Sequence, residues 1–468
     1  MSLRLNVYGL SVDELVERAA SVANLAMLRT YAEPSSIQIA AIDVYTPLLE
    51  SKLESLHPSD IRSRDRIQAQ LDIHRSILAP IRRLPVEILS YIFSLVAEEV
   101  PLRTLNIAVT LSRICIAWRK VAREHAELWT TVVVDTLGGF DEYCGLFLPL
   151  TKKMPLDLRC DDREILGDLW DRMAPYASRW RRITLEARLS MLPDLKVLYM
   201  ERLERLVIFA YDAPVSTELS ALDFVVAPRL RHVALTLDEL QSERQLHIPV
   251  TRTLTSLIIE AMTPFPITHA LPLLRACAGT LQSLTLKVRY PLEGPEGSYP
   301  TSASDTFIME SLTFLSVVDP ACALLNHITA PHIEVLILSN VPTYGARSLS
   351  GFLTRDQASR HLIDLRVYKP EERDISAWLP CLQLMVTLTD LHFDDLLSKR
   401  EFLEQLVVRH ADGHPLLPSL QNVNITKIFF DHQELHDVIR QLCRSRAKKT
   451  QYRGRLAYRR LGWIEDYP

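Results

Sequence analysis

A short apolar pattern returns ten times between residues 180 and 425, and it restricts the fold more than any other feature of the sequence. Each copy places one apolar residue, a second three positions later, and a third two positions after that. Successive copies begin 21 to 32 residues apart, and their average spacing is about 27 residues. The copies are Trp180, Ile183 and Leu185; Leu203, Leu206 and Ile208; Leu230, Val233 and Leu235; Leu254, Leu257 and Ile259; Leu281, Leu284 and Leu286; Leu312, Leu315 and Val317; Ile333, Leu336 and Leu338; Leu362, Leu365 and Val367; Leu388, Leu391 and Phe393; and Leu420, Val423 and Ile425.

The spacing within each copy predicts a short strand with one buried side. Residues two apart in a strand point to the same side, so the last two apolar positions share a face. Parallel stacking of such strands buries these positions in one continuous core and turns the residues between them outward. Helical periodicity between copies, as in residues 267–278 and 402–409, predicts a strand, a turn, a helix and a return in each unit.

The period of these copies matches that of leucine-rich repeats. Residues 131–434 are therefore expected to form an irregular leucine-rich-repeat solenoid, with parallel strands on the concave face and helices or loops outside. The asparagine that would form a ladder between the turns is mostly missing, with Asn340 as the exception. The repeats are therefore expected to be irregular.

The outward positions of the predicted strands are candidates for binding a protein substrate. They mix both charge signs with apolar and aromatic side chains, which suits a protein partner better than a phosphate backbone. The alternative is that these side chains are only solvated. The candidate residues are Phe314, Val335, Ile337, Asp364, Arg366, Tyr368, Asp390 and His392.

The first 79 residues predict helices. Ser11 and Glu14 have the spacing of a capping box at the start of a helix that reaches about residue 28. A second apolar stripe after Pro34 runs to about residue 56, and Pro47 could mark its true beginning. Residues 1–58 are therefore assigned to N-terminal helices.

Residues 59–79 predict a further helix that leads into the next segment. His74 interrupts its apolar stripe and is expected to be a partly exposed helix residue rather than a ligand. The N-terminal helices could form a short coiled coil, but each stripe covers only about two heptads. The preferred interpretation is that they pack against each other and on the segment that follows.

Residues 80–130 carry an ordered set of motifs. Leu84-Pro85 precedes Glu87-Ile88-Leu89, and Ile92-Phe93 follows; an Ile-Cys-x-x-Trp element ends at Trp118, and Leu-Trp ends at Trp129. Pro85 suits the first turn of a helix, and Glu87 lies near the positive end of its dipole. From the spacing alone, the core of an ordinary helical bundle is the preferred interpretation.

The ordered combination resembles the F-box, a small three-helix module, and its entry resembles that of the F-box-like proteins of mushroom-forming fungi. The resemblance implies docking onto a Skp-family adaptor and, through it, onto a cullin. The spacing before Ile114 is longer than is usual for an F-box, and residues 98–101 are expected to form an extended loop. The residues that would contact the adaptor or support the contact are Leu84, Pro85, Ile88, Leu89, Ile92, Phe93 and Trp118.

Composition and missing motifs argue against several other classes. The formal net charge of -4 gives no global reason to expect nucleic acid or an anionic membrane as a partner. The seven cysteines are scattered singly, so neither a zinc site nor a disulfide framework is indicated. Glycine is scarce, with 13 residues, and no phosphate-binding loop or nucleophile elbow is found. We therefore expect no catalytic residue, no cofactor and no metal, and a cytoplasmic or nuclear protein without a membrane span.

Two further segments admit more than one interpretation. Residues 291–304 are rich in proline, glycine and serine and are expected to be a loop, either a tolerated insertion or a binding or phosphorylation site. Residues 435–468 begin with an apolar stripe and then carry many lysines and arginines. A solvated capping segment is preferred there over an RNA-binding or nuclear-import element.

Taken together, these features predict an α/β chain with a helical, F-box-like first part and a repeat solenoid behind it. The leading hypothesis is a non-catalytic substrate-recognition subunit of an SCF-type ubiquitin ligase. The alternative is a leucine-rich-repeat interaction scaffold, or a nucleic-acid-associated protein that uses its basic tail. In that case the F-box-like bundle would be purely structural.

Overall fold

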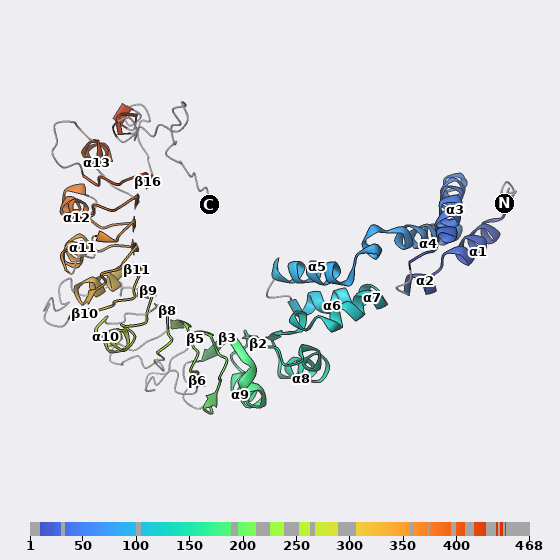
Figure 1. Ribbon diagram of the computed structural model, residues 1–468, viewed down its shortest axis with the longest axis horizontal. Coiled ribbons are helices and arrows are strands. Elements are labelled where there is room, and N and C mark those ends of the chain that lie inside the picture. The colour runs from blue at the N-terminus through green and yellow to red at the C-terminus, as the bar shows by residue number, and fades with distance from the viewer. Residues whose placement is uncertain are drawn as a thin grey trace. The chain divides into compact units, whose positions relative to one another are not determined.

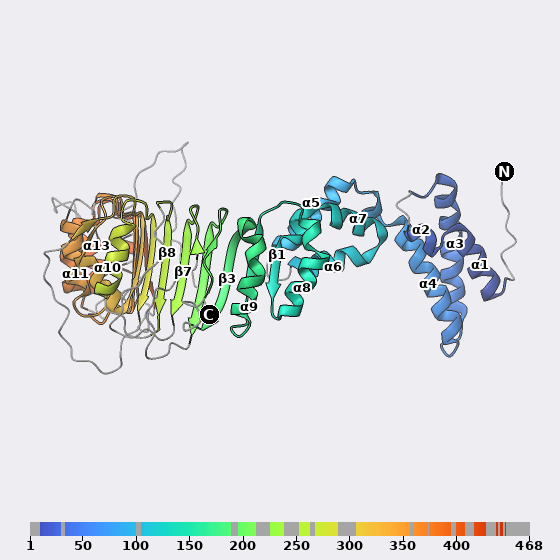
Figure 2. The same ribbon diagram turned by 90° about the horizontal axis from the view of Figure 1, so that it is seen from below.

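The structure is a computed structural model of a mixed α/β chain (Figures 1 and 2). It divides into two compact units, residues 1–133 with 138–156, and residues 134–137 with 157–468. The residues that it describes are 10–29, 33–99, 104–188, 195–211, 225–237, 252–262, 267–288, 306–355, 360–372, 374–394, 399–407, 416–426, 437, 438, 440–442 and 445.

The chain begins with helices α1 (Val12–Val22), α2 (Leu25–Arg29), α3 (Ser36–Ser55) and α4 (Ile61–Leu78). The predicted capping box is present, because the Ser11 hydroxyl accepts the Glu14 N–H and the Glu14 carboxylate accepts the Ser11 N–H. The single helix predicted to residue 28 is interrupted at Ala23, whose backbone is extended. Pro47 lies inside α3 and does not mark its beginning.

Helices α1, α3 and α4 share one core. Leu15 and Ala19 of α1 pack with Leu49 of α3 and with Ile67 and Leu71 of α4. The prediction that these helices pack against each other is therefore confirmed.

The expectation that His74 is partly exposed was wrong, because its side chain is fully buried. Its Nδ1 lies 3.1 Å from the Thr46 hydroxyl, and its Nε2 lies 3.5 Å from the carbonyl of Ala19. Gln70, one helical turn earlier, donates to the Ala23 carbonyl at 2.6 Å. Burial lowers the pKa of His74, although the Ala19 carbonyl opposes the shift. The ring is therefore a structural group that links three helices.

The next helices are η1 (Pro80–Arg83), α5 (Val86–Glu99), α6 (Thr104–Ile114), α7 (Ile116–Glu124) and η3 (Ala126–Trp129), followed by α8 (Leu137–Leu146) and η4 (Leu148–Thr151). Trp129 lies at their centre: its indole N–H donates to the Ala122 carbonyl at 2.7 Å, and the Tyr143 hydroxyl donates to the Trp129 carbonyl at 2.8 Å. Glu98 and Glu99, where a loop was predicted, still belong to α5. Residues 100–103 lie outside the described part of the chain.

A sheet of twelve strands dominates the rest of the chain, in the order β1-β2-β3-β5-β7-β8-β9-β11-β13-β14-β15-β16. The pairs from β3 to β16 are parallel. The strands are β1 (Thr131–Val134), β2 (Leu156–Cys160), β3 (Trp180–Arg188), β5 (Arg205–Tyr211), β7 (His232–Leu237), β8 (Ser256–Ala261), β9 (Ser283–Val288), β11 (Phe314–Val318), β13 (Val335–Ser339), β14 (Asp364–Tyr368), β15 (Asp390–Asp394) and β16 (Asn422–Thr426). Two short parallel pairs join β4 (Leu198–Tyr199) to β6 (Val225–Val226) and β10 (Phe307–Ile308) to β12 (Ile328–Thr329).

Each of the ten predicted strand positions lies in this sheet. The second apolar position of each copy pairs with the same position of the next, as Leu284 does with Leu315 and Leu315 with Leu336. The third position does the same, as Leu286 does with Val317. The prediction of parallel strands that bury these residues is confirmed for the described side chains except Val423 in the last strand, which is half-buried.

The connecting helices that the structure describes behind the later strands are α10 (Ile267–Ala276), α11 (Gly345–Thr354), α12 (Leu379–Leu384) and α13 (Lys399–Leu406). All four lie on one side of the sheet (Figure 1). A further helix, α9 (Leu166–Met173), lies between β2 and β3. The predicted helix at 267–278 corresponds to α10. The one at 402–409 starts three residues earlier than predicted, and residues 408 and 409 lie outside the described part.

Main-chain bonds between turns take the place of the missing asparagine ladder. The carbonyl before one strand accepts two N–H groups of the next unit, as Gln282 does from Thr313 at 2.9 Å and from Phe314 at 3.0 Å. The Thr313 hydroxyl donates to the same carbonyl. Asn340 has a positive φ of 49° directly after β13, and its own N–H donates to the Tyr368 carbonyl. Its role is thus a left-handed turn, which asparagine tolerates well.

No helix within the described ranges is both long enough and apolar enough to cross a lipid bilayer.

Candidate protein-docking surfaces

Helix α5 divides the seven predicted adaptor residues between its core side and its outer side. Leu89 and Phe93 are 1% and 0% exposed and pack in one cluster with Ala97, Val121 and Trp129. Leu89 and Phe93 can therefore support the surface that would contact an adaptor, but they cannot contact the adaptor themselves.

The other predicted residues are accessible. Ile88 is 47% exposed and Pro85 is also exposed, while Leu84, Ile92 and Trp118 are half-buried. The Trp118 ring lies 5.0 Å from that of Phe93, centroid to centroid, and this half-buried side chain packs against the core. Trp118 is held at the start of α7, because the Cys115 sulfur caps this helix by accepting the Trp118 N–H.

Ile88, Ile92 and Leu95 are accessible along one side of α5, and together with Leu84, just before the helix, they form what we call the outer stripe. The steps of four and three residues from Ile88 to Ile92 and Leu95 place these three along one side of the helix. Leu95, 44% exposed, was missing from the sequence prediction, although this spacing could have identified it.

Other large apolar side chains of the same helical segment are also exposed. They come from η1, from α5 and from the junction of α6 with α7, and none was assigned a role from the sequence. They are Ile81, Val86, Tyr91, Val96, Ile114 and Ile116. Exposed aliphatic and aromatic side chains are candidates for a surface that binds another protein.

The polar side of α5 is tied to the rest of the unit. The Ser94 hydroxyl lies 2.8 Å from Nε2 of His125, which precedes η3. This contact fixes the rotation of α5 on its core and thereby keeps the outer stripe turned outward.

The second surface is the side of the sheet opposite α10–α13, which we call the open face. All eight residues predicted to bind substrate lie at accessible or half-buried positions there, and neighbouring strands hold them in register. One line of paired positions crosses the sheet, and we call it the open row. Its residues, in order, are Arg182, Arg205, His232, Ser256, Ser283, Phe314, Val335, Asp364, Asp390 and Asn422.

The C-terminal end of the open face contains acidic and aromatic groups. Arg366 forms an ion pair with Asp364 at 2.7 Å. Asp390 accepts hydrogen bonds from two neutral donors, the Thr389 hydroxyl at 2.5 Å and the Asn422 amide at 2.6 Å.

His392 lies in the middle of this acidic end. Its ring packs against Tyr368 at 4.6 Å between centroids. Burial lowers the pKa of His392; Asp394 and Asp364 oppose this shift, and Arg366 adds to it. The ring is therefore neutral at pH 7 and adds no positive charge to this end of the face.

The N-terminal end of the open face is rich in arginine. Arg181 and Arg182 both donate to the carboxylate of Asp157, at 2.8 and 2.6 Å. Burial alone would raise the pKa of Asp157, but the hydrogen bonds from the two guanidinium groups outweigh it and lower the pKa. Arg182 also interacts with the negative charge of Glu204, so Arg181 and Arg182 are largely balanced, and the positive charge at this end of the open row comes chiefly from Arg205.

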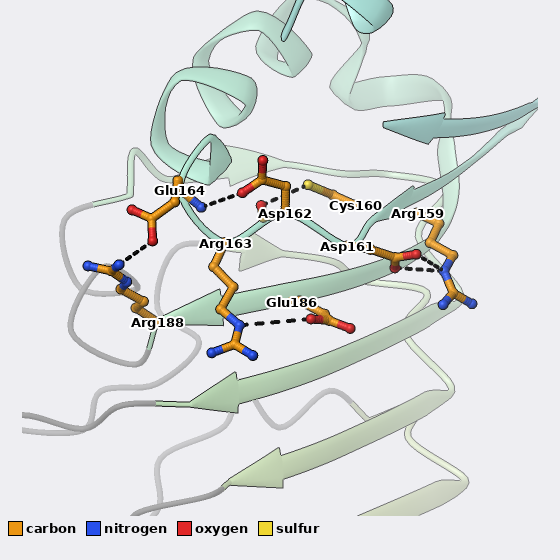
Figure 3. A network of polar contacts seen from close by, with 8 residues as sticks. All are labelled: Arg159, Cys160, Asp161, Asp162, Arg163, Glu164, Glu186 and Arg188. Carbon is orange, nitrogen blue, oxygen red and sulfur yellow. Dashed lines mark hydrogen bonds and ion pairs between the residues drawn. The ribbon is translucent and has the colours of Figure 1, made fainter. Parts of the chain in front are cut away.

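A network of ion pairs lies nearby, at the carboxyl ends of β2 and β3 (Figure 3). Arg159 binds Asp161 at 2.7 Å, Arg163 lies 3.9 Å from Glu186, and Arg188 pairs with Glu164. The Arg163 guanidinium also lies over the Tyr211 ring, 4.0 Å from its centroid. Each of these charges has an opposite partner, and the pairs Arg163–Glu186 and Arg188–Glu164 join the segment after β2 to β3, so we regard the network as a structural clamp.

Titratable groups of other kinds form no site among the described residues. No three of their histidine, cysteine and acidic side chains lie close enough together to hold a metal ion. Burial raises the pKa of the Cys160, Cys277 and Cys381 thiols to about 11 and that of Cys322 to about 12, so these thiols stay protonated. The predicted loop at 291–304 lies outside the described residues, as does most of the basic segment 435–468.

Comparisons with known proteins add no identification: no protein-family model matches the chain, and no curated protein matches it. The inference of function therefore depends on the two surfaces themselves.

Proposed function

We propose that the chain is the substrate-recognition subunit of an SCF-type ubiquitin ligase. Residues 80–130 act as an F-box that docks onto a Skp-family adaptor, which in turn binds a cullin. Residues 131–434 act as a leucine-rich-repeat solenoid that binds a protein substrate. The chain itself performs no bond chemistry and contributes proximity between substrate and ligase.

The observation that carries this proposal is the exposed outer stripe of α5, which lies within the sequence that resembles an F-box. An amphipathic helix that lays an apolar side into a partner groove is a common mode of recognition. The inner side of α5 already has its own core, formed with Leu89 and Phe93. The outer stripe is thus apolar surface beyond what the fold of this unit uses, and a partner protein accounts for it.

The sheet supports the second half of the proposal. On the open face, each of its ten repeat strands presents side chains that are aligned with those of the next strand, about 4.8 Å away. An extended surface of this kind suits a long segment of a protein better than a small molecule. The mixture of charged, aromatic and aliphatic groups on it is typical of a protein interface.

A pull-down with a purified Skp-family adaptor tests the docking step. The variant Ile88→Asp/Leu95→Asp places two charges on the outer stripe, where both side chains are exposed, so the fold should persist. We expect the wild-type chain to retain the adaptor and this variant to bind it at least tenfold more weakly, since central apolar anchors each contribute more than about 1 kcal/mol.

The matched control is Ile37→Asp/Val386→Asp, which makes the same chemical change at two exposed positions elsewhere. It should bind the adaptor as the wild-type chain does. Equal binding by the stripe variant and the control, or no binding by the wild-type chain, would refute docking through α5.

A further inference from the structure

The charges of the open row are separated along the sheet. Its first three positions are Arg182, Arg205 and His232, and its acidic positions, Asp364 and Asp390, lie near the other end. The four positions between these groups are uncharged, and they include the half-buried Phe314 and Val335. One line of the sheet therefore runs from basic through apolar to acidic.

Neighbouring ion pairs leave this separation in place. Arg182 shares Asp157 with Arg181 and also interacts with the negative charge of Glu204, whereas Arg205 has no ion-pair partner among the described residues. At the other end Arg366 neutralises Asp364, but Asp390 is bonded only to neutral groups within the same part of the chain. The two charges most available to a ligand are therefore those of Arg205 and Asp390.

We propose that the open face binds an extended protein segment whose charges are separated in the opposite sense. Its acidic residues lie over β3, β5 and β7, its apolar residues over β11 and β13, and its basic residues over β14 and β15. This inference concerns the face that the proposed function assigns to the substrate. It names the chemistry of that substrate and does not depend on adaptor docking.

The register gives the distance between the two charged parts of the ligand. Strands β5 and β15, which carry Arg205 and Asp390, are seven positions apart in the sheet. At about 4.8 Å for each position the two residues are separated by about 34 Å. An extended peptide advances about 3.4 Å for each residue, so the centres of its acidic and basic groups should lie about ten residues apart.

A nucleic acid fits this surface poorly. Its phosphates would be attracted to the β3–β7 end, but they would meet Asp390 and the buried carboxylate of Asp394 at the other end. A protein segment can match both ends at once, because it can carry acidic and basic residues in one chain. Charge complementarity of this kind determines specificity and orientation more than raw affinity.

Synthetic peptides and the intact chain test the proposal. The probe is a fluorescent peptide with three glutamates, seven serine or leucine residues and three arginines, made in both orders. The comparison peptide has the same composition with glutamates and arginines alternating. Fluorescence anisotropy should show that at least one block peptide binds at least tenfold more tightly than the alternating peptide.

Charge reversal on the protein identifies the face. Arg205→Glu and Asp390→Lys should each weaken the block peptide at least fivefold. A peptide whose arginines are replaced by glutamates should bind the Asp390→Lys variant more tightly than it binds the wild-type chain. Arg347→Glu and Glu401→Lys make the same charge changes at exposed positions of helices α11 and α13, and they should leave binding unchanged.

Three results would overturn the proposal: no peptide binding, equal binding of block and alternating peptides, or equal losses in the face variants and the helix variants. The Ile88→Asp/Leu95→Asp variant should bind the block peptide as the wild-type chain does. A failure of adaptor docking is thereby distinguished from a failure of this inference.

Discussion

Two neighbouring residues of α5 should lose very different amounts of stability on the same substitution. Leu89 is buried in the core of residues 86–129, whereas Ile88 is half exposed on the outer stripe. We expect Leu89→Ala to destabilise this region strongly and Ile88→Ala to leave it almost intact. The pair tests whether the structure assigns the two sides of α5 correctly.

The expected sizes follow from burial. Truncation of a fully buried leucine to alanine costs about 2–5 kcal/mol, so about 3 kcal/mol is expected for Leu89→Ala. Ile88→Ala removes three carbons that are about half-buried, which costs about 1.2 kcal/mol at about 0.8 kcal/mol for each buried methylene. The higher helix propensity of alanine returns about 0.4 kcal/mol. The net cost at Ile88 should therefore lie below about 1 kcal/mol.

Hydrogen exchange followed by mass spectrometry measures the effect locally, which suits a chain of two units. Leu89→Ala should speed exchange in the peptides of α5 and α7 by roughly 10²-fold, since about 1.4 kcal/mol corresponds to a factor of ten. Ile88→Ala should change it by less than about fivefold. Leu274→Ala, in the core behind the sheet, serves as the control and should leave α5 unchanged. Equal effects at Leu89 and Ile88, or a larger effect at Ile88, would refute the assignment.

Three other regions give further predictions. The lowered pKa of His74 means that the folded helices prefer its neutral form. Their stability should be complete above about pH 6.5 and fall as the pH drops through the folded pKa of this ring. Thermal unfolding of the His74→Leu variant should lack this pH dependence. A methyl group at Gly345 would overlap the side chain of Val341, whereas a methyl group at Gly279 would meet no neighbouring heavy atom within 4 Å. In denaturant unfolding, Gly345→Ala should therefore cost about 1–3 kcal/mol of stability, and Gly279→Ala should be nearly neutral. The lowered pKa of Asp157 means that its contribution to stability is present above about pH 4 and is lost as the pH falls through the folded pKa. The Asp157→Asn variant should lose about 1–3 kcal/mol of stability at pH 7. An unchanged unfolding midpoint would contradict this role.

The strands of the sheet could be predicted from the sequence because their pattern reports burial directly. Alternate residues of a strand face opposite sides, so each apolar pair separated by one residue marks a buried side. β2 was missed because Lys153 occupies the first apolar position of the pattern. The ion pairs of Asp157 could not be foreseen either, since Arg181 and Arg182 lie on the next strand, more than twenty residues later.

The errors in the N-terminal helices have a common physical cause. A proline inside a helix costs about 3 kcal/mol, which made Pro47 look like a helix start. The buried Ile42, Tyr45 and Leu49 of the same helix offset that cost through tertiary packing. His74 likewise looked exposed because Thr46 and the Ala19 carbonyl, its partners, come from other helices. Local propensity describes one helix at a time, whereas the burial of His74 and the tolerance of Pro47 depend on contacts with neighbouring helices.

The same limit explains why sequence reasoning combined the two sides of α5. Residues of a helix are about 100° apart, so Ile88 and Leu89 both belong to one broad apolar stripe when only their spacing is considered. The structure separates them because α6, α7 and η3 pack only against the side that carries Leu89, Phe93 and Ala97. A substitution at Phe93 would therefore damage the fold and any adaptor contact together. Substitution at Ile88 and Leu95 changes the outer stripe alone, and only that experiment can distinguish a docking helix from a helix that serves the core of its own unit.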